Sequence, residues 1–263
     1  MRKFTLISLV GLALACAPAL LISQNSKAPK PKSKAESQAL QKLDKMAKDP
    51  TTTGPALEAA ITAFNTSFPT SEFLSNVSAY GLQFYQTPPH VSYEKSLFYG
   101  EQAIKADPDN LYALTTLGDI IPNNATSTDL DFSQRLQEAT KDDLQAIHVA
   151  TTAGNMINGH LFPQQAKNTA QAIAYSSLAR IANLQKNYPE VVANYQKAIP
   201  LDPPEEQAVD NFYMARAQIA MKQYTQALAS LDAASKAAPD NPQVQAAVDS
   251  NRKLIAQLQK AGN

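Results

Sequence analysis

Apolar residues recur at helical spacing from Ala35 onward, and clusters of Pro, Asn and Asp interrupt them roughly every 15 to 25 residues. The segments between the clusters are rich in Ala, Leu, Gln and Lys, which favour helix. No stretch alternates β-branched and polar residues as a half-buried strand would. The pattern therefore predicts an all-α fold. The clearest breaks are Thr87-Pro-Pro, Asp107-Pro-Asp-Asn, Ile121-Pro-Asn-Asn, Asp202-Pro-Pro and Pro239-Asp-Asn-Pro.

Three of the predicted helices end alike, which indicates an internal repeat. In each, a proline follows an alanine by five residues: Ala103 and Pro108, Ala198 and Pro203, Ala234 and Pro239. A small or β-branched residue precedes each alanine by seven positions: Ser96, Val191 and Ala227. Seven residues are almost two helical turns, so both positions share a face on which a neighbouring helix can approach closely.

Residues 172–204 carry a pattern of small, aromatic and proline residues that residues 208–241 repeat in part. The first copy has Tyr175, Leu178, Ala179, Tyr188, Tyr195, Ala198 and Pro203; the second has Tyr224, Ala227, Leu231, Ala234 and Pro239. With this pattern the chain resembles the tetratricopeptide repeat (TPR) family, whose 34-residue repeats are pairs of antiparallel helices. The resemblance implies a right-handed solenoid, with the clearest repeats at 111–150, 164–204 and 205–241, an insertion at 122–128 and a C-terminal capping helix at 242–261.

The first 34 residues differ from the rest of the chain. Arg2 and Lys3 precede an apolar run of 19 residues, 4–22, as in an export signal or a membrane anchor. Residues 23–34 form a Lys- and Pro-rich linker, and the helical domain covers 35–263. Three fates remain open for 1–22: cleavage, retention as an anchor, or lipidation on Cys16 as in a lipoprotein. All three predict an exported protein in the periplasm or cell envelope.

Charge and composition exclude several classes of function. The chain has 23 basic and 23 acidic residues, but residues 1–48 hold nine of the bases and only two of the acids. The body after residue 48 therefore carries a net charge of −7, which disfavours nucleic-acid binding because phosphates would repel it. The 8 glycines leave little material for phosphate-binding loops, and one cysteine excludes a disulfide framework.

No motif for catalysis, metal binding or cofactor binding is present in the sequence. His90, His148 and His160 belong to no metal-ligand pattern, and the acidic pairs 142–143 and 205–206 are predicted to be solvated charges, because adjacent helical residues diverge by about 100°. We therefore predict a non-enzyme without a cofactor or a metal. A closed pocket with an acid of strongly raised pKa would be the observation that favours an enzyme.

The TPR resemblance also implies a concave groove lined by the first helix of each repeat. Its inward positions are Ile173, Ser176, Arg180, Asn183 and Leu184 in one repeat, Val209, Phe212, Arg216, Ile219 and Ala220 in the next, and Tyr112, Thr115 and Asp119 in the earlier one. Arg180 and Arg216 are equivalent residues 36 positions apart, so we expect them to lie side by side and to bind an acidic group of a protein partner. The alternative is that both arginines pair with acids of their own chain.

Two functions follow from these observations. The first is a protein–protein interaction scaffold that binds an extended segment or helix of a partner in the groove. The second is a small-ligand module, for peptides or sugars, that uses the aromatic residues of 64–99. A deep pocket among Tyr80, Phe84 and Phe98 would favour the second, although most of these aromatic residues are expected to be core.

Overall fold

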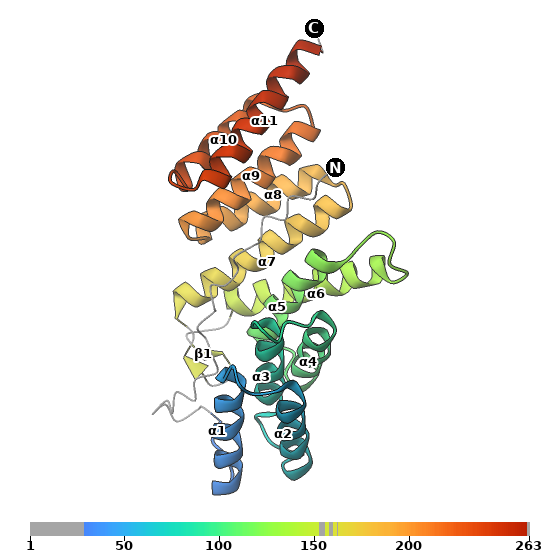
Figure 1. Cartoon of the computed structure of the whole chain (residues 1–263), viewed down its shortest axis with the longest axis vertical. Helices are drawn as coiled ribbons and strands as arrows, with labels where there is room; N and C mark the ends of the chain where they lie inside the picture. Colours follow the sequence, from blue (N-terminus) through green and yellow to red (C-terminus); the bar gives the residue numbers. More distant parts are fainter. Residues whose placement is uncertain (1–28, 153–155, 158–159, 162, 262–263) are drawn as a thin grey trace.

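A computed structural model describes residues 29–152, 156–157, 160–161 and 163–261. This part of the chain is almost entirely helical, which confirms the all-α prediction (Figure 1). The first six helices are α1 (Lys34–Lys48), α2 (Gly54–Ser67), α3 (Leu74–Gln86), α4 (Tyr93–Ala106), α5 (Leu111–Asn124) and α6 (Phe132–Thr152). The second group is α7 (Gln164–Leu184), α8 (Tyr188–Ala198), the 3-10 turn η1 (Ile199–Leu201), α9 (Pro204–Ala220), α10 (Tyr224–Ala237) and α11 (Pro242–Ala261).

Helices that follow one another in sequence pack side by side in an elongated array (Figure 1). The strongest contacts lie within the pairs α3–α4, α5–α6, α7–α8 and α9–α10, and α11 packs on α10 and α9 at the end of the array. Connections of three residues, 185–187 and 221–223, join α7 to α8 and α9 to α10. Such short connections require packed neighbours to run antiparallel.

The turn inside the two C-terminal helix pairs has the same geometry 36 residues apart. Lys186 and Lys222 both have a left-handed backbone, with φ of 59° and 62°. The amide of Asn187 donates to the Ala182 carbonyl at 2.8 Å, and the equivalent bond recurs after α9 at the same distance. This six-residue bond is the Schellman motif that ends a helix with a left-handed residue. The repeat seen in the sequence is therefore also a repeat of backbone structure.

The predicted break at Ile121-Pro-Asn-Asn is wrong, because Pro122 lies inside α5 and the helix continues to Asn124. A proline within a helix leaves the carbonyl four residues earlier without its amide donor. Here that carbonyl belongs to Gly118, and it accepts a hydrogen bond from the Ser177 hydroxyl of α7 at 2.6 Å. A tertiary contact thus replaces the missing backbone bond, and the link between α5 and α6 begins at residue 125.

A short hairpin interrupts the helices between α6 and α7 without changing the all-α class. Two strands of two residues each, β1 (Met156–Ile157) and β2 (His160–Leu161), pair antiparallel there. Met156 lies opposite Leu161 and Ile157 opposite His160. A pattern of two residues per strand is too short to be recognised as alternation in a sequence.

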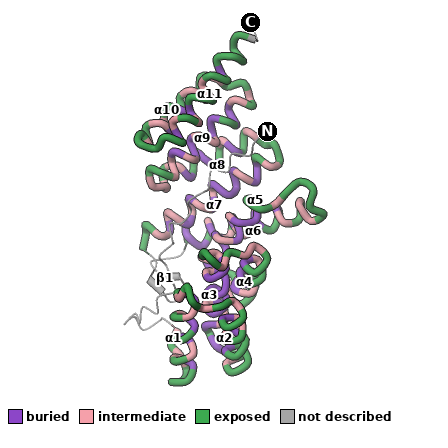
Figure 2. Tube along the Cα trace, in the orientation of Figure 1, coloured by how far each residue is buried: buried purple, intermediate pink, exposed green. Residues whose placement is uncertain are grey.

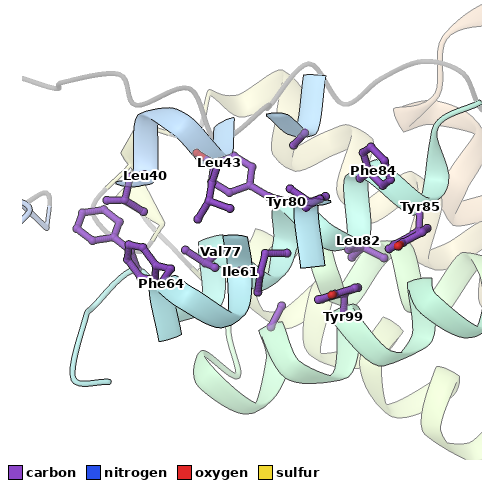
Figure 3. Close-up of a cluster of buried hydrophobic side chains, with 14 of the residues drawn as sticks. Leu40, Leu43, Ile61, Phe64, Val77, Tyr80, Leu82, Phe84, Tyr85 and Tyr99 are labelled. Carbon is purple, nitrogen blue, oxygen red and sulfur yellow. The ribbon is translucent and has the colours of Figure 1, made fainter. Parts of the chain in front are cut away.

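Large side chains fill the core between α1, α2, α3 and α4 (Figure 3). Phe64 and Phe68 contact each other with ring centroids 5.0 Å apart, and Tyr85 stacks on Tyr99 at 5.9 Å. The buried surface follows the inner sides of the helices along the whole array (Figure 2). The largest buried side chains of this N-terminal core are Leu40, Leu43, Leu57, Phe64, Tyr80, Leu82 and Phe84.

Alanine takes the place of these large residues in the C-terminal helices. The cluster between α9, α10 and α11 contains four fully buried alanines together with leucine, valine and isoleucine, and a second cluster joins α7, α8 and α9. Small side chains let the helix backbones approach closely, as the seven-residue spacing predicted. The four alanines are Ala208, Ala215, Ala227 and Ala234.

Candidate functional site

A cavity of about 850 Å³ lies between α5, α7, α8, η1 and α9. All five residues of α7 that were expected to point inward lie on its wall, and α9 contributes three of its five expected residues. Asp119 of α5 completes this group. The predicted residues that line the cavity are Asp119, Ile173, Ser176, Arg180, Asn183, Leu184, Val209, Arg216 and Ala220.

Four of the thirteen expected inward residues do not line the cavity: Tyr112, Thr115, Phe212 and Ile219. Phe212 packs against the core of α9, α10 and α11, and its ring meets Tyr213 edge-on at 5.5 Å. Tyr112 packs against the N-terminal core, where burial raises the pKa of its hydroxyl to about 12. One position along a helix changes the direction of a side chain by about 100°. That step places Tyr213, and not Phe212, on the cavity wall.

Arg180 already has an acidic partner within the chain. Its guanidinium donates to Asp119, and the two side chains are only 26% and 16% exposed. Burial opposes the charge of Arg180, but the nearby Asp119 carboxylate stabilises it, and the pKa of Arg180 stays above its ordinary value. The Arg180 Nε atom has no accessible surface and no hydrogen-bond partner. Arg180 therefore follows the alternative expectation, in which the arginine pairs with an acid of its own chain.

Arg216 has a different environment, although it lines the same cavity. It is exposed, and its guanidinium lies 6.0 Å from the centre of the Tyr213 ring. No ion pair of Arg216 is present among the described residues. The two equivalent arginines therefore share a cavity wall, but Arg216 is exposed, whereas Arg180 is partly buried and paired with Asp119.

Three carboxyl groups that the sequence analysis did not assign to the site also line the cavity: Asp202, Glu206 and Asp210. Asp210 is 4% exposed and accepts a hydrogen bond from the Ser176 hydroxyl at 2.6 Å. Glu206, predicted to be a solvated charge, is partly buried here. Glu206, Asp210 and Tyr213 follow one another at helical spacing of four and three residues, and this signal could have revealed them.

The pKa values of these three carboxyl groups are raised. Burial, followed by the negative charge of Asp210, raises the pKa of Asp202 to about 8. Burial likewise raises the pKa of Asp210 and of Glu206. Asp202 and Asp210 are hydrogen-bonded to each other, so a proton is held between them near neutral pH.

A raised acid in a pocket is the observation named above as favouring an enzyme, and Asp202 and Asp210 fit that description. Neither histidine nor cysteine is among the residues that line this cavity. The Ser176 hydroxyl donates to Asp210 at 2.6 Å. No group of three His, Cys, Asp or Glu side chains in the described ranges is arranged to hold a metal ion.

The second acidic pair predicted to be solvated, Asp142 and Asp143, is also mostly buried. Burial raises the pKa of Asp142 to about 7. Asp143 is completely buried, and burial raises its pKa well above the ordinary value. The Ser177 hydroxyl lies against the Asp143 carboxyl group and donates to the Gly118 carbonyl. Gly118 packs against Asp143, and an added Cβ would collide with the carboxyl group.

The aromatic residues expected either as core or as a ligand pocket are mostly core. Tyr80 and Phe84 are at most 2% exposed, and Phe84 stacks on His90 with ring centres 4.0 Å apart. Phe98 is 52% exposed and meets Tyr99 edge-on. His148 is exposed on α6. The residues that line the 850 Å³ cavity belong to other helices.

Comparison with known proteins identifies no relative: no family model, no curated protein and no solved structure matches this chain. The similarity to TPR proteins therefore depends on the residues of this sequence alone. No helix within the described ranges is long and apolar enough to cross a bilayer. Cys16 and the apolar run 4–22 lie outside those ranges.

Proposed function

We propose that this chain is a non-catalytic scaffold that binds a segment of another protein in the cavity between α5, α7, α8 and α9. The observation that carries the proposal is the composition of the cavity wall. Nine residues chosen from the sequence as inward positions of a groove line one cavity. A volume of 850 Å³ falls within the usual range of ligand sites and accommodates a few residues of a peptide.

The proposed architecture is a TPR-like right-handed solenoid in which α7–α8 and α9–α10 are consecutive repeats and α11 is the capping helix. The repeated left-handed turn at Lys186 and Lys222 supports this assignment, as does the equivalence of Arg180 and Arg216, because each pair is 36 residues apart. In such an array the groove is built from the first helices of successive repeats, here α5, α7 and α9.

The proposed location is the cell envelope, after export directed by residues 1–22. The support is the order of Arg2 and Lys3 before the apolar run 4–22. Cleavage, lipidation of Cys16 and retention as an anchor are all compatible with export. In each case the described helical domain would meet its partner outside the cytoplasm.

A photo-cross-linking amino acid at position 216 tests the scaffold proposal in cells. Arg216 lines the cavity and is exposed, so the substitution does not disturb the core. Lys236 of α10 is the matched control, because it is an exposed basic helical residue that does not line the cavity. We expect a defined protein adduct from position 216 and none from position 236.

A second change links the adduct to the cavity itself. Ala220 is exposed and lies on the cavity wall, so Ala220→Trp adds a large ring there without burying it in the core. We expect this variant, checked for unchanged helicity by circular dichroism, to reduce the adduct at least fivefold. Equal adducts from positions 216 and 236, or an adduct insensitive to Ala220→Trp, would contradict the proposal.

A further inference from the structure

The cavity wall carries more carboxyl groups than basic groups. Arg180 is engaged by Asp119, and that ion pair contributes no net charge. Three carboxyl groups then remain with one exposed guanidinium, that of Arg216. An acidic partner group, as the sequence suggested, would meet this carboxyl cluster as well as Arg216. The charged residues of the wall are Asp119, Arg180, Asp202, Glu206, Asp210 and Arg216.

Arg180, which is already paired with Asp119, is the basic side chain that faces all three carboxyl groups. No ion pair joins Asp202, Glu206 or Asp210 to a basic side chain within the described ranges. Burial makes a negative charge on this cluster costly, and a cation in the cavity would offset that cost.

Apolar side chains lie on the same wall as the carboxyl cluster. Ile173 and Leu184 of α7, Leu201 of η1 and Val209 of α9 all contribute to it. A lysine or arginine side chain needs this combination, because its aliphatic stem packs on apolar surface while its charged end reaches a carboxylate. An acidic side chain is too short and has the wrong charge for the same place.

We propose, building on the scaffold function, that the bound partner segment inserts a lysine or arginine side chain whose charged end lies against Asp202, Glu206 and Asp210. The cation takes the place of the proton held between Asp202 and Asp210. That proton leaves to solvent, and the carboxylate that remains is paired by the ammonium or guanidinium. The O–H bond of that proton breaks as it passes to water, and no bond between heavy atoms changes.

Proton release makes the binding pH-dependent. A proton on the Asp202–Asp210 pair competes with the cation, so binding strengthens as rising pH removes it. The charged and titratable groups that face the pair are Arg180 of α7, Tyr195 of α8 and Glu206 of α9. Asp119 of α5 and Asp143 of α6 face Arg180, and Tyr213 and Arg216 of α9 face Tyr195.

Three capped, fluorescently labelled pentapeptides test the inference on the full chain. They have the sequence Ala-Ala-Xaa-Ala-Ala, where Xaa is lysine, Nε-acetyl-lysine or glutamate. Acetylation removes the positive charge but keeps the aliphatic stem. We expect the dissociation constant of the lysine peptide to be at least tenfold lower than those of the other two, and this preference to increase between pH 6 and pH 9.

The double variant Asp202→Asn/Asp210→Asn removes both charges, while asparagine can still accept the Ser176 hydrogen bond. The control Glu72→Gln/Asp240→Asn neutralises two exposed acids outside the cavity. We expect the cavity variant to lose the preference for lysine to within twofold and the control to keep it. Circular dichroism and thermal melts establish that both variants are folded.

Two results would overturn the inference. One is a lysine preference that survives in the cavity variant, which would indicate general attraction to the acidic body. The other is the same affinity for all three peptides, or a preference for glutamate. If position 216 still cross-links a partner in either case, the scaffold proposal stands and only the cationic side chain is wrong.

Discussion

The two halves of the helical array are stabilised in different ways. Helices α1 to α4 bury large side chains such as Phe64, Tyr80 and Phe84, whereas α9 to α11 pack through small ones such as Ala227. In the first core, aromatic rings fill much of the apolar volume. In the second, alanine contacts bring the helix backbones close together, while larger polar side chains of α7 and α9 line the cavity.

The difference between the two halves indicates which part of the chain is suited to binding. The aromatic half has its largest side chains committed to packing. The C-terminal half concentrates buried carboxyl groups and an ion pair around one cavity. Polar groups inside a protein cost stability unless they are paired, and they are therefore the first candidates for a role in binding.

The largest effect is expected from emptying the aromatic core. Phe64→Ala removes a side chain that is 2% exposed, and we expect the free energy of unfolding to fall by about 3–5 kcal/mol. Phe98→Ala, at a position 52% exposed, is the matched control and should change it by no more than about 0.5 kcal/mol. Chemical denaturation measures both. Similar losses of unfolding free energy in the two variants would contradict the assignment of Phe64 to the core and Phe98 to the surface.

A smaller effect is expected from overfilling the alanine contacts. Ala227→Leu inserts three carbons at a completely buried position between α9 and α10, and we expect a loss of about 1–3 kcal/mol. Ala229→Leu places the same side chain on the exposed side of α10. Thermal denaturation of both compares them directly. If Ala227→Leu proved as stable as Ala229→Leu, close approach of the backbones would not be what stabilises the C-terminal half.

The smallest effect is expected from the buried Asp143 at the junction of α5, α6 and α7. Its raised pKa means that the folded state holds a proton that the unfolded state has released above about pH 3.9. Its contribution to stability is therefore full below that pH and declines as pH rises toward the folded pKa, by up to about 1.4 kcal/mol per unit. In Asp143→Asn we expect this part of the decline to disappear.

Denaturation at pH 5 and pH 6 measures this slope. The free energy of unfolding of the wild type, taken relative to that of Asp143→Asn, should fall by roughly 1 kcal/mol between pH 5 and pH 6. The exposed Asp240→Asn is the control and should keep the wild-type slope. Parallel pH profiles for wild type and Asp143→Asn would show that this carboxyl group reaches water in the native state and that its burial is not a cost to the fold.

Periodicity in the sequence determined the helices, because helix-forming residues and proline-containing breaks act locally. The prediction of a helix over 242–261 and the α11 of the structure have the same bounds. The spacing of Arg180 and Arg216 similarly placed both on one cavity wall, since a fixed repeat length implies equivalent positions. Packing constraints that repeat along the chain can be recognised in the sequence alone.

Only the tertiary structure decided what those positions contact. Pro122 stays inside α5 because Ser177, 55 residues later, satisfies the Gly118 carbonyl. Arg180 is neutralised by Asp119 from a different helix pair, and Asp202 meets Asp210 across the start of α9. The charge of the cavity depends on these distant pairings, because a local pattern specifies the face of a helix but not the group that lies opposite it.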